Sequence, residues 1–228
     1  MSWLLVPLLL VGSPEEATIR LPHQDLVSRI ASESSTGTLL VSEGDCLAVR
    51  TFTGSPYTHV GTVVVRDGRR FVYDSTAGQG VRCQTLENYV RWLDQHEVRL
   101  LHPARPLTDE AEAAFVRHLD GELGRPYAVL HHLTGERCDG VHCAEYVTDA
   151  LVAANRLKVQ KSPRVSPASL VVGVTQSGLY TDGTRLRLEP PPPPAVSQSD
   201  SWCTQCWIET KACAKWCWKK TRGLVLCQ

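Results

Sequence analysis

The Asp-Gly pair at residues 67–68 constrains the fold most strongly, because it predicts a tight hairpin turn within a strand-forming region. Residues 58–66 before the pair are rich in β-branched side chains, and residues 69–74 after it form the expected return strand. His59 and Asp74 each lie some seven or eight residues from the centre of this turn. We therefore expect them at near-opposite positions, with both side chains on one face of the hairpin.

After the hairpin, the spacing of apolar residues changes to the period of a helix. Thr108 precedes a run of acidic residues, which is typical of a helix N-cap. Strand runs and helix runs are segregated along the chain, so the sequence predicts an α+β fold. Helices are expected at 86–93, 108–123 and 141–157, and further short strands at 46–50, 170–174 and 186–188.

Changes in composition divide the 228 residues into four parts. The 24 basic and 24 acidic residues of the whole chain cancel, so no overall charge favours binding to nucleic acid. The expected parts are an apolar segment with a polar lead-in at 1–38, one domain at 39–189, a proline-rich linker at 190–201 and a Cys/Trp/Lys-rich tail at 202–228.

The apolar run within residues 1–12 is too short to span a bilayer as a helix. It resembles the apolar part of a secretory signal peptide, but it has no basic residues before it, and Pro14 follows the candidate cleavage site. A strand or a docking segment is the alternative interpretation. Together with the tail, the run favours an exported or membrane-associated protein over a cytoplasmic one.

Cys143 and His59 are the candidate reactive pair. A thiol becomes a good nucleophile when its pKa is lowered, and the N-terminus of a helix and a nearby imidazole both do this. Cys143 lies at the expected start of the 141–157 helix, and Gly140 before it allows a sharp approach of the chain. With Asp74 as the residue that orients the imidazole, the hairpin and the helix would supply a Cys/His/Asp site.

Five short motifs, in this order, resemble the YiiX/YebB-like branch of the NlpC/P60 superfamily, which contains circularly permuted papain-like cysteine hydrolases. The match covers roughly residues 40–155, and the order and spacing of the motifs make it specific. The motifs are Gly44-Asp45, Tyr57-Thr-His59-Val-Gly61, Val72-Tyr-Asp74 with Gly80-Val81, Gly124-Arg-Pro-Tyr127 and His142-Cys143-Ala-Glu145-Tyr-Val147.

The resemblance implies a small antiparallel sheet or partial barrel packed against helices, with the nucleophile at a helix N-terminus. It also implies Cys143 as nucleophile, His59 as base and Asp74 as the acidic third member, where the branch commonly has Glu. The substrate or oxyanion region would include Tyr127 and Tyr57. Glu145 and His142 are interpreted as solvent-facing or structural.

The expected function is that of a thiol hydrolase that attacks an amide, peptide or ester carbonyl without a cofactor. Two alternatives stay open. One is a lipid acyltransferase or thioesterase, which the basic, Trp-rich tail favours slightly. The other is a membrane-tethered binding module without activity, which only the Asp at position 74 favours.

A zinc site is the competing interpretation of the residues around Cys143, because five Cys and His residues cluster there. The spacing does not favour it: four residues separate Cys138 from Cys143, so the usual C-x2-C pattern is absent. A zinc site would also leave His59 and Asp74 without a role. The five residues are His131, His132, Cys138, His142 and Cys143.

The tail carries five Lys or Arg residues against one Glu from Ser201 onward, and four of the six tryptophans. Zinc binding would require the chain to turn back between Cys206 and Cys213, where no Gly, Pro, Asn or Asp is present. As a helix, the tail would place four cysteines on one stripe. This pattern favours a helix at a membrane interface through residues 202–220, with zinc, disulfide formation and docking to a partner protein as alternatives.

Overall fold

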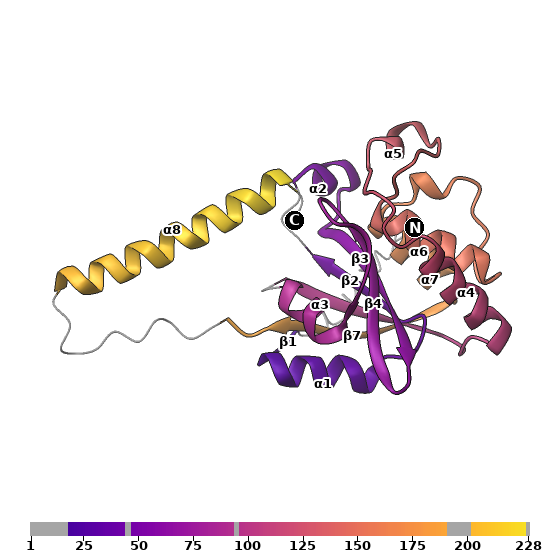
Figure 1. The fold of residues 1–228 in the computed structure, drawn as a ribbon, viewed down its shortest axis with the longest axis horizontal. Helices are drawn as coiled ribbons and strands as arrows, with labels where there is room; N and C mark the ends of the chain where they lie inside the picture. The colour runs from indigo at the N-terminus through magenta and orange to yellow at the C-terminus, as the bar shows by residue number, and fades with distance from the viewer. Residues whose placement is uncertain (1–17, 44–46, 94–95, 191–201, 227–228) are drawn as a thin grey trace, which may run out of the picture.

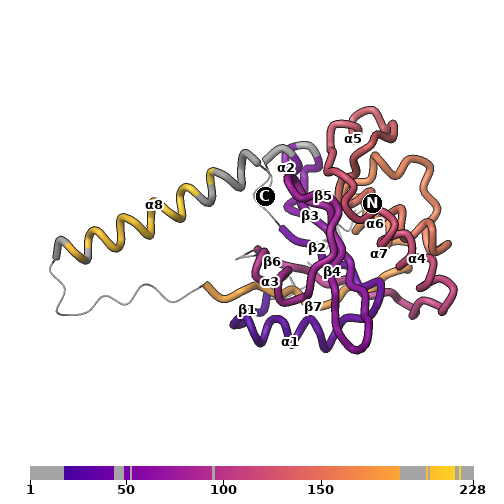
Figure 2. The backbone as a smooth tube through the Cα atoms, in the orientation of Figure 1, coloured from indigo at the N-terminus to yellow at the C-terminus, as the bar shows by residue number. Residues whose placement is uncertain are grey.

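The computed structural model describes residues 18–43, 47–93, 96–190 and 202–226 (Figures 1 and 2). Within these ranges, seven strands form one sheet in the order β1-β7-β6-β2-β3-β4-β5. The strands are β1 (Ile19–Leu21), β2 (Leu39–Glu43), β3 (Tyr57–Arg66), β4 (Arg69–Thr76), β5 (Gly80–Thr85), β6 (Glu97–Pro103) and β7 (Tyr180–Leu188). The helices are α1 (His23–Glu33), α2 (Leu47–Thr53), α3 (Leu86–Leu93), α4 (Asp109–Gly121), α5 (His131–Thr134), α6 (Cys143–Ala153), the 3₁₀ helix η1 (Ser162–Arg164), α7 (Pro167–Gln176) and α8 (Trp202–Leu226).

Helices cover both faces of the sheet, so its central strands are buried on both sides (Figure 1). Successive side chains of a strand point to opposite faces. Leu39 and Val41 of β2 therefore pack in the core with α4, α6 and α7, whereas Leu40 packs in the core with α1 and α3. The predicted α+β class is confirmed. The sheet is antiparallel except for β1, which pairs parallel to β7.

The β3–β4 hairpin forms as predicted. Asp67 and Gly68 both have positive φ angles, 49° and 74°, as a tight hairpin turn requires. Thr62 pairs with Tyr73, and continuing this register places Asp74 beside Gly61, two residues from His59. A separation of two residues keeps both side chains on the same face of the sheet. The orienting carboxylate therefore approaches His59 diagonally rather than from directly across the hairpin.

The three predicted helices also form. α3 covers 86–93 as expected, and the Thr108 side chain caps α4 by accepting a hydrogen bond from the backbone N–H of Ala111. α6 begins at Cys143, two residues after the predicted start. Residues 186–188 lie in β7 as predicted.

Two predicted strands are wrong. Residues 170–174 belong to α7, whose start carries a capping box between Ser166 and Ser169 and has Pro167 in its first turn. Residues 47–50 belong to α2, which ends where the Gly54 N–H donates to the Arg50 carbonyl with a positive φ of 61°. At residues 170–174 the capping chemistry outweighs the β-branched composition. Gly44, Asp45 and Cys46 lie outside the described residues.

Residues 19–33, which the composition placed in the polar lead-in, form β1 and α1 and pack with the domain. The buried residues of α1 are Leu26, Val27 and Ile30. The apolar run at residues 1–12 lies outside the described ranges, as does most of the linker, residues 191–201.

α8 is one continuous helix, in agreement with the helical interpretation of the tail. Trp207, Trp216 and Trp218 are exposed on it, and the Lys211 ammonium lies 4.7 Å from the centre of the Trp207 ring. In the part of the chain that the structure describes, no helix combines the length and the apolarity needed to cross a membrane. Membrane association and zinc binding by the tail both stay predictions.

Candidate active site

Cys143 is the first residue of α6, and its side chain is almost completely buried. The N–H groups of the first helical turn have no acceptor within the helix, so this position favours a negative charge. Gly140 allows the approach that the sequence predicted. A Cβ atom at Gly140 would lie 2.5 Å from the Cβ of Ala128, so only glycine lets the two segments pass this closely.

His59 and Asp74 form a hydrogen-bonded pair on the hairpin. His59 Nε2 donates to Asp74 Oδ2 over 3.1 Å, and the Asp74 carboxylate is fully buried. The His59 side chain also hydrogen-bonds to Cys143. The Trp92 ring packs edge-on against the imidazole with 5.0 Å between ring centres, which restricts its rotation.

Arg82, which the sequence did not indicate, holds the far side of the carboxylate. Asp74 and Arg82 are direct partners in the β4–β5 ladder. The guanidinium donates twice, from Nε to Oδ1 over 2.7 Å and from Nη2 to Oδ2 over 3.0 Å, and it lies 4.9 Å from the centre of the Trp92 ring. A fork of two hydrogen bonds fixes the plane of a carboxylate, so Arg82 orients the group that orients His59.

These contacts shift the pKa values of the two reactive groups in opposite directions. Burial alone would lower the pKa of His59, but hydrogen bonds to Asp74 and Cys143 outweigh it and raise the pKa to about 9. Burial alone would raise the pKa of Cys143, but hydrogen bonds to His142 and His59 outweigh it and lower the pKa to about 6. The lowered pKa of Cys143 and the raised pKa of His59 both favour a thiolate next to an imidazolium.

His142 is a second buried imidazole beside the thiol. Burial lowers its pKa and hydrogen bonding to Cys143 raises it, with a net rise. Its Nε2 donates to the Pro163 carbonyl over 2.9 Å, and its Nδ1 accepts from the Glu145 N–H over 3.3 Å, which caps α6. Both His142 and Glu145 are buried. The prediction that they face solvent is therefore wrong, and a structural role is the alternative that agrees with their burial.

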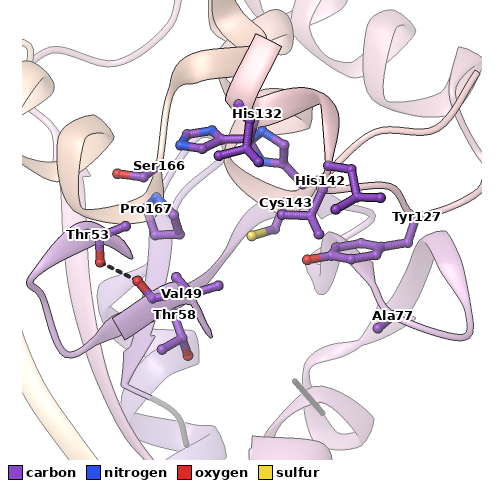
Figure 3. A pocket seen from close by; sticks show the side chains of 13 residues that line it. Val49, Thr53, Thr58, Ala77, Tyr127, His132, His142, Cys143, Ser166 and Pro167 are labelled. Atoms are coloured by element: carbon purple, nitrogen blue, oxygen red, sulfur yellow. Dashed lines mark hydrogen bonds between the residues drawn. The ribbon is translucent and has the colours of Figure 1, made fainter. Parts of the chain in front are cut away.

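A cavity of about 350 Å³ opens beside Cys143, and residues of α2 and α5 line it (Figure 3). Tyr127 lies in its wall, as the resemblance implied, and Figure 3 shows the sulfur pointing into the cavity. Tyr57 is not part of this wall, contrary to expectation. It packs against the core and its hydroxyl accepts a hydrogen bond from Arg99 over 2.9 Å. The adjacent Thr58 lines the cavity instead.

Comparison with known families decides the membership of the chain. The model of the C92 family, described as permuted papain-like amidase enzymes of the YaeF/YiiX type, matches residues 34–173, more than half of the chain. The chain belongs to this family. The matched range contains the hairpin, α6 and the cavity wall, and the family is one of amidase-like hydrolases. This confirms the YiiX-like resemblance, whereas the NlpC/P60 superfamily assignment stays a prediction.

Among solved structures, this C92-family chain is similar to the metalloprotein yiiX from Escherichia coli O157:H7. The two chains are 16% identical, the alignment covers 70% of this chain and 99% of that one, and the TM-score is 0.49. No curated protein matches the chain.

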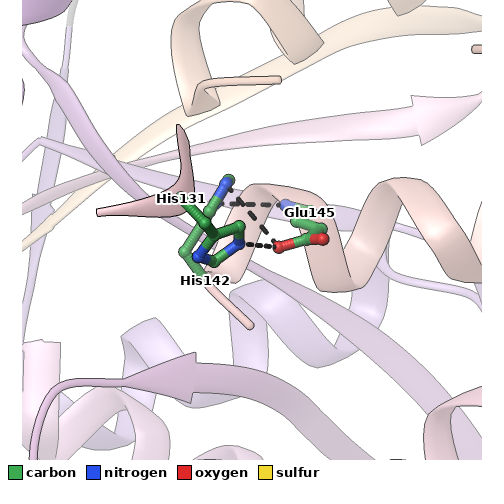
Figure 4. A group of neighbouring side chains, drawn as sticks. All are labelled: His131, His142 and Glu145. Carbon is green, nitrogen blue, oxygen red and sulfur yellow. Dashed lines mark hydrogen bonds and ion pairs between the residues drawn. The ribbon is translucent and has the colours of Figure 1, made fainter. Parts of the chain in front are cut away.

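Next to the thiol, this C92-family chain also holds a buried group with metal-ligand chemistry, formed by His131, His142 and Glu145 (Figure 4). Their ligand atoms lie within 4.8 Å of one another. Two atoms bound to one tetrahedral zinc ion lie about 3.4 Å apart, whereas His131 Nε2 and Glu145 Oε2 are 2.6 Å apart. That distance is a charge-assisted hydrogen bond. The other nitrogen of His131, Nδ1, contacts the Cys138 sulfur at 3.2 Å, so we interpret the group as a network that braces the start of α6.

Proposed function

We propose that the protein is a thiol hydrolase that cleaves an amide or related acyl bond, with Cys143 as nucleophile, His59 as base and Asp74 as the orienting residue. The observation that carries this proposal is the continuous chain of contacts from the buried Cys143 thiol to His59 and on to the fully buried Asp74. Family membership supports the amidase-like reaction.

The reaction divides into two acyl transfers. The Cys143 thiolate attacks the substrate carbonyl carbon, and its backbone N–H at the start of α6 can donate to the oxyanion that forms. The His59 imidazolium gives its proton to the leaving nitrogen, which departs as an amine and leaves a thioester on Cys143. His59, now neutral, takes a proton from water, and the resulting attack releases the acid and restores the thiol pair.

The short Asp at position 74 does not favour the inactive binding module. Its carboxylate reaches His59 Nε2 at 3.1 Å, and Arg82 fixes it from the other side. We assign the base to His59 rather than to His142, because the far nitrogen of His142 bonds to a neutral carbonyl.

The dependence of the rate on pH tests this function. We expect kcat/KM for a small amide or ester to rise through pH about 6, where Cys143 loses its proton, and to fall through pH about 9, where His59 loses its proton. Initial rates between pH 4.5 and 10.5 would measure both limbs, with Cys143→Ala as the blank. A rate that only rises, following hydroxide, would show that the pair does not act.

A further inference from the structure

Cys138 is a second thiol that lies beside an imidazole. It is located between α5 and α6, and its sulfur is 3.2 Å from Nδ1 of His131. The sulfur also lies 3.4 Å from the Gly140 carbonyl oxygen, which helps to hold it in place. Cys138 is exposed and is not part of the cavity wall that contains Cys143. A reagent in solution can therefore reach this thiol without entering the cavity.

The imidazole of His131 is held on its far side by a carboxylate. His131 Nε2 lies 2.6 Å from Glu145 Oε2, and both side chains are buried (Figure 4). When Nε2 donates its hydrogen to this carboxylate, the lone pair of Nδ1 faces the Cys138 sulfur. A thiol, a base and an orienting carboxylate thus follow one another within hydrogen-bond reach, which is the arrangement that activates a nucleophile.

The second oxygen of the same carboxylate lacks a hydrogen-bond partner. Glu145 is fully buried, and its Oε1 accepts no hydrogen bond from any residue that the structure describes. Arg137 and His142 lie 3.8 and 3.9 Å from the carboxylate oxygens, beyond hydrogen-bond distance. A buried carboxylate is costly unless a positive charge is in contact with it. A proton that moves from Cys138 to His131 would supply this charge.

We propose that Cys138, His131 and Glu145 form a second thiol site, separate from the Cys143 site, which reacts with hydrogen peroxide. His131 takes the thiol proton, and the Cys138 thiolate attacks one oxygen of the peroxide. A sulfur–oxygen bond forms as the oxygen–oxygen bond breaks, and the departing hydroxide takes the proton from His131 and leaves as water. The sulfur is oxidised by two electrons to a sulfenic acid, and the peroxide is reduced.

The chemistry of the site favours a peroxide over a larger substrate. Attack on a peroxide requires a thiolate, access from solvent and an acid that protonates the departing hydroxide. Cys138 and His131 supply all three, because the sulfur is exposed and the imidazole is in contact with it. A larger substrate would need a binding wall, and the wall of the cavity beside Cys143 does not include Cys138.

Treatment of the full-length protein with hydrogen peroxide at pH 7 tests the proposal, with dimedone to trap sulfenic acids and mass spectrometry to assign them. Cleavage before Asp139 places Cys138 and Cys143 in separate peptides. Cys213 is the internal reference, because it is also a free, exposed thiol and its helix, α8, contains no histidine. We expect Cys138 to react at least about tenfold faster than Cys213. Equal rates, or a slower reaction at Cys138, would overturn the proposal.

Two histidine variants identify the base. His131→Gln should lower the rate at Cys138 at least about tenfold and leave the rate at Cys213 unchanged, because glutamine cannot take the thiol proton. His102→Gln makes the same change at a half-buried histidine on β6, whose ring contacts Thr38, and it should keep both rates. If Cys138 reacts equally fast in the two variants, His131 is not its base and the proposal is wrong.

Unfolding provides a measurement that does not depend on a variant. In concentrated urea the contact between Cys138 and His131 is lost, and we expect Cys138 and Cys213 to react within about twofold of each other. If the tenfold advantage of Cys138 persisted in urea, it would arise from neighbouring residues in the sequence, and the folded site would be ruled out. The product at Cys138 is read directly, so these results do not depend on the hydrolase function proposed for Cys143.

Discussion

Cys143→Ala is expected to lower kcat/KM for hydrolysis of an acyl substrate by a factor of at least about 10⁴, because the covalent route disappears with the sulfur. The fold should persist, since alanine fills most of the space of a small thiol at a helix start and leaves the His142 cap in place. Steady-state rates with a p-nitrophenyl ester would give the ratio, and circular dichroism would verify the fold.

Cys83→Ala is the matched control for this change. Cys83 is a half-buried thiol on β5, and burial raises its pKa, so it is a weak nucleophile at neutral pH. We expect its replacement to leave kcat/KM within about twofold. A Cys143→Ala protein that retained more than about a tenth of the activity would contradict the assignment of the nucleophile.

Asp74→Asn is expected to have the second largest effect, because it acts on both activity and stability. An amide cannot satisfy His59 and Arg82 as a carboxylate does, so the imidazole loses its fixed tautomer and orientation. A comparable loss in another triad lowers kcat by about 10⁴, and we expect kcat/KM to fall by about 10² to 10⁴. The largely buried Arg82 loses its charged partner, which is expected to cost about 3 kcal/mol of unfolding free energy.

Asp182→Asn shows whether this stability effect is specific. Asp182 also accepts a pair of hydrogen bonds from an arginine, Arg99, but its side chain is 38% exposed. Loss of a solvent-exposed ion pair is expected to cost less than about 1 kcal/mol. Urea unfolding of the two variants gives the comparison, and equal losses would show that Asp74 is not the constrained carboxylate described above.

The sequence predicted the parts of the site that lie close together along the chain. The turn at 67–68 set the register that brings His59 and Asp74 to one face, and the apolar period of residues 141–157 located the helix that begins at Cys143. These features depend on interactions between residues that are close in the sequence, so the local sequence pattern predicts them.

The parts that the sequence did not predict depend on contacts between distant segments. Arg82 was missed because its role follows from the pairing of β4 with β5, for which the glycines at residues 78 and 80 were the only signal. His142 was missed as a buried cap because histidine is an unusual N-cap residue. Tyr57 was placed in the site by resemblance alone, whereas its hydroxyl bonds to Arg99, which lies on the distant strand β6.

The most direct test of the central claim is the pH dependence of alkylation at Cys143 by a small reagent such as iodoacetamide, read for that peptide by mass spectrometry. Full-length protein and His59→Ala would be compared. We expect reactivity to rise with a midpoint at pH about 6 in the unchanged protein, and this midpoint to move above pH about 8 in His59→Ala. An ordinary thiol midpoint near pH 8.5 in both proteins would contradict the thiolate–imidazolium pair.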